Sequence, residues 1–413
     1  MPERHAAPAP GRLGALGLLR RRAGFRNLWL ALTLSYAGTG SALTALLLYA
    51  QRSQGTGIAV AAILLALMLP RLLGPVAGAI ADRTDLRRLM IGCDVGQTAL
   101  YASIALLPPF GVIVALTAVA TLLTAAYAPA RTALLPNLVE RDELLSANSL
   151  IGTAFNMQVA VGPLLGGLLF AAGGASLALR VNAGTFAMSA LLTSLVPRTP
   201  PREADPDGPG ILTETREGFR YAMSHPVVRV VVLTLFFGLI FLTMDNVALV
   251  FLVRSTLDGG AVAFGIAFAA FGVGMIVGAL ALLGHRRFSP LTLYLAGLVM
   301  TGLGTLLTGL APAIAFVIPF QALAGAGNGI DNVANETLLQ QRVPRSMLGR
   351  VFGLTGTAAN AGGGLAALLG GLLLDVTSPR TVLVIGGAGG LVVAAVAIAA
   401  VARNPGRDTS PSG

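Results

Sequence analysis

Apolar runs long enough to cross a membrane recur along the whole chain, separated by short polar intervals. A helix needs about 20 apolar residues to cross the hydrocarbon core of a bilayer, and twelve segments approach or exceed this length. They predict helices over 27–50, 58–80, 89–107, 111–130, 145–171, 177–196, 229–253, 261–283, 291–310, 313–335, 347–374 and 381–402. The pattern therefore predicts an all-α membrane protein with twelve transmembrane helices.

The longest polar interval divides these spans into six and six. It opens with the proline- and charge-rich stretch "PRTPPREADPDGPG" and continues into "ILTETREGFRYAM", where apolar residues recur at helical spacing. This spacing predicts an amphipathic helix lying on the membrane surface. The predicted organisation is a tail at 1–26, a six-helix bundle at 27–196, a linker at 197–228, a second bundle at 229–402 and a tail at 403–413.

An internal repeat supports the same division. The segment "IGTAFNMQVAVGPLLGGLL" at 151–169 aligns without gaps on "TGTAANAGGGLAALLGGLL" at 355–373, an offset of 204 residues. Parallel repeats of six helices are one of the architectures of secondary transporters. The repeat predicts two six-helix pseudo-repeats with the same topology.

The distribution of basic residues predicts the orientation. All 28 basic residues are arginine; four lie on one side (Arg52, Arg180, Arg254 and Arg380), Arg71 lies within a span, and the other 23 lie on the opposite side. Cytoplasmic segments carry the excess of positive charge. Both termini and the linker are therefore predicted to be cytoplasmic. The arginine excess does not indicate nucleic-acid binding, because the arginines lie between apolar segments rather than together on one polar domain.

Composition excludes several classes of function. The chain is 55% hydrophobic with a mean hydropathy of +0.78, has one cysteine, Cys93, and three dispersed histidines. A disulfide framework or a metal site is not expected from this content. No GxxxxGK[ST] loop is present, so ATP hydrolysis is not expected. We expect no cofactor, no metal and no enzymatic activity.

A cluster of charges follows the second span in "GPVAGAIADRTDLRR", residues 74–88. Gly78 permits close approach of a neighbouring helix, and Asp82 then lies at the cytoplasmic edge. There it can face the positive N-terminus of the eleventh span or pair with Arg131 or Arg350. The sequence predicts a cytoplasmic gate latch here; the alternative is a solvated, positively charged loop.

These residues resemble a family signature. Gly78, Asp82, Arg83, Arg87 and Arg88 resemble the loop between the second and third helices of the major facilitator superfamily. The resemblance implies the major facilitator fold and transport by alternating access.

Two further motifs indicate a branch of this superfamily. "GPLLGG", with Gly162, Pro163, Gly166 and Gly167, is similar to the fifth-helix motif of its exporters. The segments 129–150 and 338–353 resemble the branch that contains macrolide-efflux and enterobactin-export proteins.

The chain also departs from this pattern. The first span has Gly38–Thr39 where the branch often has Gly–Asp, and Arg286 stands where the second half would repeat the latch aspartate. The cytoplasmic latch is therefore expected to be one-sided.

Polar side chains inside the spans are the candidate proton or substrate sites, because an ionised group near a helix centre costs about 2.5–3.5 kcal/mol on insertion scales. The candidates are Asp245, Asn246, Asp331, Asp94, Arg71 and Glu336. For Asp245, coupling to protons and a structural pairing with Arg71 or Arg180 stay equally open. For Asp331, a role in proton or substrate binding and a structural role also stay equally open. A structural role is favoured for Asp94, and Glu336 lies close enough to the interface to be solvated.

The sequence thus predicts a proton-coupled exporter of a hydrophobic or amphipathic small molecule, such as a drug, macrolide or siderophore. We expect it to act as a multi-pass monomer in a bacterial inner membrane, with protons, a small-molecule substrate and the lipid bilayer as its partners. The alternatives are a proton-coupled or facilitative importer of a nutrient, a lipid flippase, or a membrane sensor that does not transport.

Overall fold

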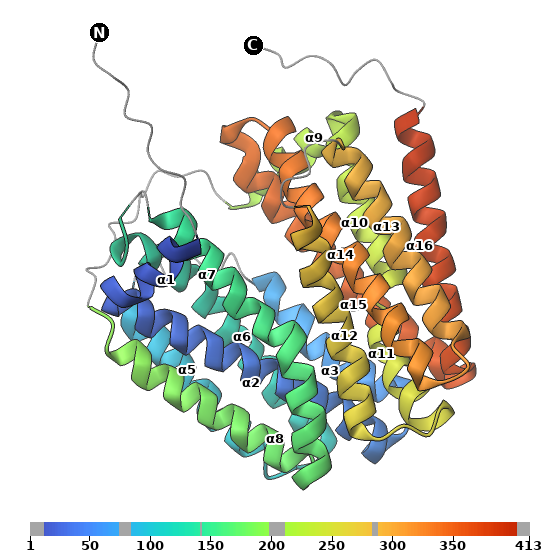
Figure 1. Cartoon of the computed structure of the whole chain (residues 1–413), viewed down its shortest axis with the longest axis horizontal. Helices are drawn as coiled ribbons and strands as arrows, with labels where there is room; N and C mark the ends of the chain where they lie inside the picture. The colour runs from blue at the N-terminus through green and yellow to red at the C-terminus, as the bar shows by residue number, and fades with distance from the viewer. Residues whose placement is uncertain (1–11, 74–83, 141–142, 198–210, 283–287, 403–413) are drawn as a thin grey trace.

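The structure, a computed structural model, describes residues 12–73, 84–140, 143–197, 211–282 and 288–402. Every regular element in these ranges is helical, so the prediction of an all-α protein is confirmed. In Figure 1 the helices form two groups that diverge toward the end of the molecule at which both termini lie. We call this the terminal end, and the opposite one the far end.

The first half contains the elements from α1 to α8. Their bounds are α1 (Arg12–Arg21), α2 (Ala23–Gln54), α3 (Gly57–Met68), η1 (Leu69–Leu73), α5 (Leu86–Ile104), α6 (Phe110–Leu134), η2 (Leu135–Asn137), α7 (Leu144–Asn156), η3 (Met157–Val161) and α8 (Gly162–Ser194).

The second half contains the elements from α9 to α16. Their bounds are α9 (Ile211–Ser224), α10 (Pro226–Leu242), α11 (Asp245–Phe251), η4 (Leu252–Thr256), α12 (Ala261–Ala281), α13 (Pro290–Leu310), α14 (Ile314–Arg342), α15 (Arg345–Val376) and α16 (Pro379–Ala402).

Among the described residues, eight helical stretches are long and apolar enough to cross a membrane, and Gly57–Leu73 is a shorter apolar one. Two predicted spans, in α5 and α14, fall outside this set. Both helices contain buried polar side chains, which include Asp94 and Asp331, and these lower their apolar character. The number of spans, twelve, stays a prediction.

Two predicted spans run together in the long stretch Ser146–Ser194. The chain nevertheless breaks inside α8, where Gly173 and Gly174 are not helical and Gly174 has a φ of 70°. Glycine adopts this left-handed conformation without steric cost. The break lies between the predicted spans 145–171 and 177–196.

Helix α9 occupies the linker segment that predicts a surface helix, but much of it packs against protein. Ala222 is fully buried in a cluster with residues of α10 and α15, while Phe219 is exposed. Glu217 accepts a hydrogen bond from Arg350 at 2.6 Å. The helix is therefore attached to the terminal end of the second half rather than only to lipid.

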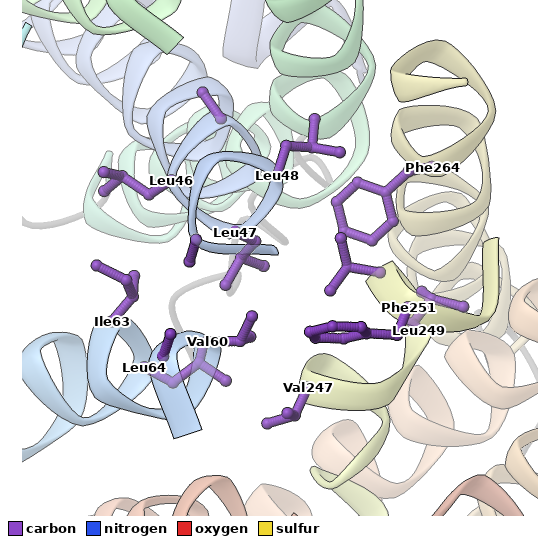
Figure 2. Close-up of a cluster of buried hydrophobic side chains, with 14 of the residues drawn as sticks. Leu46, Leu47, Leu48, Val60, Ile63, Leu64, Val247, Leu249, Phe251 and Phe264 are labelled. Atoms are coloured by element: carbon purple, nitrogen blue, oxygen red, sulfur yellow. The ribbon is translucent and has the colours of Figure 1, made fainter. Parts of the chain in front are cut away.

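The two halves share one hydrophobic core at the far end. This cluster joins the end of α2 and the start of α3 to α11 and α12, and Figure 2 shows Leu47 and Val60 of the first half facing Val247, Phe251 and Phe264 of the second. Burial of apolar side chains contributes about 25 cal/mol per Å². The far end is therefore the firmly packed end of the molecule.

At the terminal end each half has buried clusters of its own. One cluster joins α9, α10, α13, α14 and α15 around the buried ring of Tyr294. Two others lie in the first half, one around Leu28 and Met90 and one around Phe25 and Leu150. The described halves are thus packed together at the far end and built separately at the terminal end.

Two helix crossings related by the internal repeat join the halves at the far end. A Cβ at Gly167 on α8 would lie 2.6 Å from the carbonyl oxygen of Ala261 on α12. A Cβ at Gly371 on α15 would lie 2.8 Å from the carbonyl oxygen of Gly57 on α3. Both positions in the second crossing differ from those in the first by 204 residues, the offset of the repeat. Small residues at such crossings let the backbones touch.

A side-chain hydrogen bond lies between these crossings. Gln51 Nε2 donates to Ser255 Oγ at 3.1 Å, and these residues are also 204 positions apart. The repeat therefore brings equivalent positions of the two halves together at the far end.

Gly371→Leu should separate the halves at the far end, because its Cβ would lie 2.7 Å from Cβ of Ala61. Overpacking of this kind costs about 1–3 kcal/mol, which shifts a population by about 5- to 150-fold. The measurement is the rate of disulfide cross-linking between Gln51→Cys and Ser255→Cys, introduced together in a Cys93→Ser background. We expect this rate to fall.

Gly356→Leu is the matched control on the same helix, because a Cβ at Gly356 would have no neighbour within 4 Å. It should cross-link at the rate of the parent. Equal rates in the two leucine variants would contradict the assignment of Gly371 to the contact between halves.

Candidate functional site

A break in the seventh predicted span places Asp245 at a helix start. Helix α10 ends at Leu242, and α11 begins at Asp245 after two residues in a turn. The N–H groups of Asn246 and Val247 donate to the carbonyl oxygens of Thr243 and Met244, so the turn keeps these backbone hydrogen bonds while it interrupts the helix. Interrupted helices form the substrate and ion sites of many transporters.

Helix α14 presents polar side chains along one face. Asn328 follows Gln321 by seven residues, and Asp331 and Asn332 follow Asn328 by three and four residues, which places all four on the same side of a helix. Gly297 on α13 faces this helix, and a Cβ there would lie 2.7 Å from Cβ of Asp331. The close approach of α13 leaves Asp331 only 6% exposed.

The helix break and the polar face of α14 meet in a cavity of about 350 Å³ inside the second half. Asp245 and Asp331 both line it, and each is 6% exposed. The cavity is lined by Thr234, Leu235, Gly238, Leu239, Leu242, Thr243, Asp245, Asn246, Phe268, Phe271, Leu298, Thr301, Gln321, Asn328, Asp331, Asn332 and Ala359. The structure therefore brings together Asp245, Asn246 and Asp331, which the sequence treats as separate candidates.

The hydroxyl groups in this cavity donate to backbone carbonyls. Thr301 Oγ1 donates to the oxygen of Gly297 at 2.9 Å, and Thr234 and Thr243 donate to carbonyls one turn earlier. A hydroxyl whose proton is used in this way can only accept from a ligand. Among the described groups, Gln321 Nε2 is buried and has no hydrogen-bond partner, so it is a donor available to the cavity.

Asp94 lies in the first half, away from this cavity. It is 1% exposed, and its Oδ2 accepts a hydrogen bond from Ser189 Oγ at 2.8 Å, which joins α5 to α8. Its Oδ1 is buried without a partner among the described groups, as is the hydroxyl of Tyr127. This arrangement gives Asp94 a structural contact and leaves one oxygen able to take a proton.

The remaining charged candidates are exposed. Arg71 lies on η1, which packs against α6 and α15, and Glu336 lies on the outer part of α14. Arg180 donates to Ser176 Oγ at 2.8 Å. Within the described residues, no ion pair joins Asp245 to an arginine, so the structural pairing with Arg71 or Arg180 finds no support.

The predicted cytoplasmic latch is only partly visible. Gly78, Asp82 and Arg83 lie outside the described residues. Arg87 Nη2 donates to the carbonyl oxygen of Ser194 at the end of α8, and Arg88 lies 3.9 Å from Asp85, which caps α5. The described contacts of Arg87 and Arg88 therefore lie within the first half.

The two proposed latch partners also bind within their own halves. Arg131 Nη1 donates to Tyr36 Oη at 2.6 Å, and Arg350 donates to Glu217. At the same end Arg22 pairs with Glu140, whose hydrogen bond raises the pKa of Arg22 above its usual value. The latch across the halves stays a prediction.

The fifth-helix motif lies where three helices meet. A Cβ at Gly162 would lie 2.6 Å from Cα of Gly40 on α2, and Gly166 faces Ser41 of the same helix. Gly167 faces α12, as does the carbonyl oxygen of Pro163, which would lie 2.7 Å from a Cβ at Gly265. One face of the motif thus packs within the first half and the other against the second.

A residue that the sequence did not single out connects the halves at the far end. Asp375, near the end of α15, accepts hydrogen bonds from the backbone N–H groups of Gly57 at 2.5 Å and Ile58 at 3.3 Å, at the start of α3. The N-cap residue of α3, Thr56, makes no side-chain capping bond. Asp375 therefore caps a helix of the other half, and Ala171 occupies the equivalent position of the first repeat.

The described residues contain no group of three or more histidine, cysteine or acidic side chains that could hold a metal ion. The polar groups of the cavity are carboxylates, amides and hydroxyls that do not form such a group. The carboxylates of Asp245 and Asp331 are its acidic side chains.

Comparison with known sequences gives consistent matches. The model of a family described as transmembrane secretion effector matches residues 14–412. The chain is 28% identical over 374 residues to the MFS-type transporter YfiS of Bacillus subtilis, which covers 87% of this chain and 88% of that protein. It is 34% identical over 244 residues to the enterobactin exporter EntS of Citrobacter koseri, which covers 57% of this chain and 56% of that protein.

Solved structures of transporters share the fold. The nucleoside transporter NupG superposes with a TM-score of 0.73 at 14% identity, covering 91% of this chain and 98% of its own. A bacterial homologue of the lysosomal transporter Spinster, in an inward-facing and unoccupied conformation, gives a TM-score of 0.65 at 16% identity and covers 92% of this chain and 96% of its own. These likenesses concern the fold alone.

Asp375→Ala should weaken closure of the far end, because it removes the acceptor for the first N–H groups of α3. Loss of an N-cap costs about 0.5–2 kcal/mol, so cross-linking of Gln51→Cys with Ser255→Cys should fall by roughly two- to thirtyfold. Asp375→Asn keeps an acceptor but not the charge, and it should have a smaller effect.

The control for this experiment is Thr377→Ala, at the same end of α15, whose hydroxyl donates to its own helix at Leu373. Its cross-linking should match the parent. If Asp375→Ala also matched the parent, the cap would not contribute to closure.

Proposed function

The chain belongs to the transmembrane secretion effector family of major facilitator transporters, and from this premise we propose that it is a proton-coupled exporter of an amphipathic small molecule. The observation that carries the proposal is the cavity that holds Asp245 and Asp331 inside a protein whose halves, in the part of the chain that the structure describes, share a core at the far end. A site in one half, combined with closure at one end, supports transport by alternating access.

The packing of the halves supports rocking about the far end. Their shared cluster and both glycine crossings lie there, while the clusters of the terminal end belong to single halves. Opening of the far end would have to break these contacts, and closure of the terminal end would have to replace them. Each ligand then shifts the equilibrium by its difference in affinity for the two states.

The orientation proposed from the arginines makes the terminal end cytoplasmic. With both termini and the linker in the cytoplasm, a state closed at the far end would receive substrate from inside. The exporter of Citrobacter koseri, a bacterium with two membranes, supports a place in the inner membrane. The protein would act there as a monomer, with protons and a small molecule as its ligands.

Proton coupling is supported by the burial of the two carboxylates. An ionised carboxylate in a dry interior costs several kcal/mol unless it is paired. Within the described residues no ion pair with arginine supplies that compensation, whereas binding a proton removes the charge. Asp245 and Asp331 are therefore the proposed proton carriers, and Asp94 is a further candidate in the first half.

The proposed direction of transport rests on the family and on the exporter-type motif at 162–167. The family description is that of secretion, and the matched protein of Citrobacter koseri is named as an enterobactin exporter. The alternatives are an importer, a lipid flippase and a sensor. A sensor would keep working without acids in the cavity, and an importer would give the opposite sign of flux.

Asp245→Asn and Asp331→Asn should each abolish accumulation driven by a pH gradient while still permitting substrate exchange across the membrane at saturating substrate concentration. The amide mimics the protonated acid but cannot release a proton. A screen of compound accumulation in cells with and without the protein identifies a substrate. Its uptake into everted, acid-loaded vesicles then gives the direction and should fall by at least about tenfold, the effect of about 1.4 kcal/mol.

Asp258→Asn is the matched control for these variants. Asp258 is exposed in the loop between η4 and α12 and has a φ of 52°, a conformation that asparagine accepts. The flux of this variant should not change. Full gradient-driven flux in the double variant of Asp245 and Asp331 would contradict their assignment and direct attention to Asp94.

The cytoplasmic latch is proposed from the sequence of residues 74–88. Asp82→Asn should slow transport without preventing insertion, since it removes the charge that the sequence predicts to face a helix N-terminus, an interaction of about 0.3–1 kcal/mol. Arg286→Gln and Arg287→Gln should be milder. Loss of flux in the arginine variants together with a tolerated Asp82→Asn would place the gate in the other half.

A further inference from the structure

We propose that the cavity of the second half binds amphipathic molecules that carry a single protonated amine, so that the substrates of this transporter are organic cations. The inference rests on the proposed function, because it names the substrate class of the same site. Its support comes from the charges, hydrogen bonds and rings that line the cavity.

The ionisable groups of the cavity have one sign. Asp245 and Asp331 are its acidic residues, and no arginine or histidine is among the described residues that line it. A buried charge is tolerated best when an opposite charge accompanies it. A bound ammonium group supplies that charge, whereas an anionic substrate would add a third negative group to a site without a cation.

The threonine hydroxyls of the cavity favour a ligand that donates, and the buried Nε2 of Gln321 offers a donor beside them. Thr234, Thr243 and Thr301 use their protons on backbone carbonyls, and therefore offer only lone pairs to a ligand. An ammonium group with N–H bonds can donate to these oxygens and to the carboxylates. A quaternary ammonium group can do neither, so a protonated amine fits the site better.

The rest of the lining suits an apolar body. Phe268 and Phe271 on α12 contribute aromatic rings, and leucines of α10 and α13 contribute aliphatic surface. Aromatic rings attract cations within about 6 Å of their centres, and cavities of about 300–1,000 Å³ hold drug-sized ligands. A cavity of about 350 Å³ is therefore suited to a small amphipathic amine.

Arg71, the arginine inside the second predicted span, lies outside this cavity. Arg71 is on η1 of the first half and does not line the cavity. If Arg71 instead provided the main contact with substrate, the protein would prefer anions. The charge preference of the whole protein therefore distinguishes the two sites.

Three fluorescent probes with the same dansyl group test this preference. Dansylcadaverine carries one ammonium group, its N-acetyl derivative is neutral, and dansyl-6-aminohexanoate is an anion. Binding is titrated by dansyl fluorescence with the purified full chain in detergent, without a gradient. We expect the cation to bind at least about tenfold more tightly than the neutral probe, and the anion to bind most weakly.

Variants then locate the preference. Asp245→Asn and Asp331→Asn should each reduce cation affinity by about tenfold or more and leave the neutral probe unchanged, whereas the control Asp258→Asn should keep both affinities. The neutral probe reports that the cavity is still folded. Equal affinity for cation and neutral probe, preference for the anion, or an unchanged preference in the double variant would each overturn the inference. The unaltered protein alone can give the first two results.

The outcome is separable from that of the proposed function. Binding of the cation without its gradient-driven movement in proteoliposomes would refute coupled export and leave the inference standing. Gradient-driven export of a compound together with no charge preference among the probes would do the reverse.

Discussion

The arrangement of the two halves depends on how closely two pairs of helix backbones approach at the far end. Gly167 and Gly371 leave no room for a Cβ against the facing carbonyl oxygens. Because these contacts are made by backbone, small changes in the angle between the helices break them. The shared hydrophobic cluster then separates as well. The packing that closes the far end therefore also fixes how far apart the halves lie at the terminal end.

The cavity has a different origin, which is the loss of helical continuity in one half. The turn before Asp245 interrupts the seventh predicted span, and the polar face of α14 lines the same cavity. The carboxylate and amide groups that line it would not be tolerated against lipid, where unsatisfied polar groups cost several kcal/mol. Enclosure by six helices allows them, and it concentrates the ionisable groups where water is scarce.

Much of the helical organisation was predictable from the sequence, because apolar runs and the repeat at 151–169 and 355–373 are read directly from residue types. The position of Asp245 and Asp331 in one cavity was not, since it depends on how the helices from α10 to α15 pack around it. The cap by Asp375 was missed for the same reason. A signal existed in the repeat, where Ala171 occupies the position equivalent to Asp375. A single difference between the repeats does not reveal that Asp375 binds Gly57, which is 318 residues away.

The two glycine crossings are two copies of one contact, made once by each half on the other. Such reciprocity is the property of an isologous interface between identical subunits. A single six-helix half with this contact could therefore have assembled as a two-fold dimer before the halves were joined in one chain. In a dimer every side chain occurs on both sides of the axis. Fusion removes that restriction, and it allows one half to carry an acid at Asp375 and a polar cavity while the other keeps Ala171.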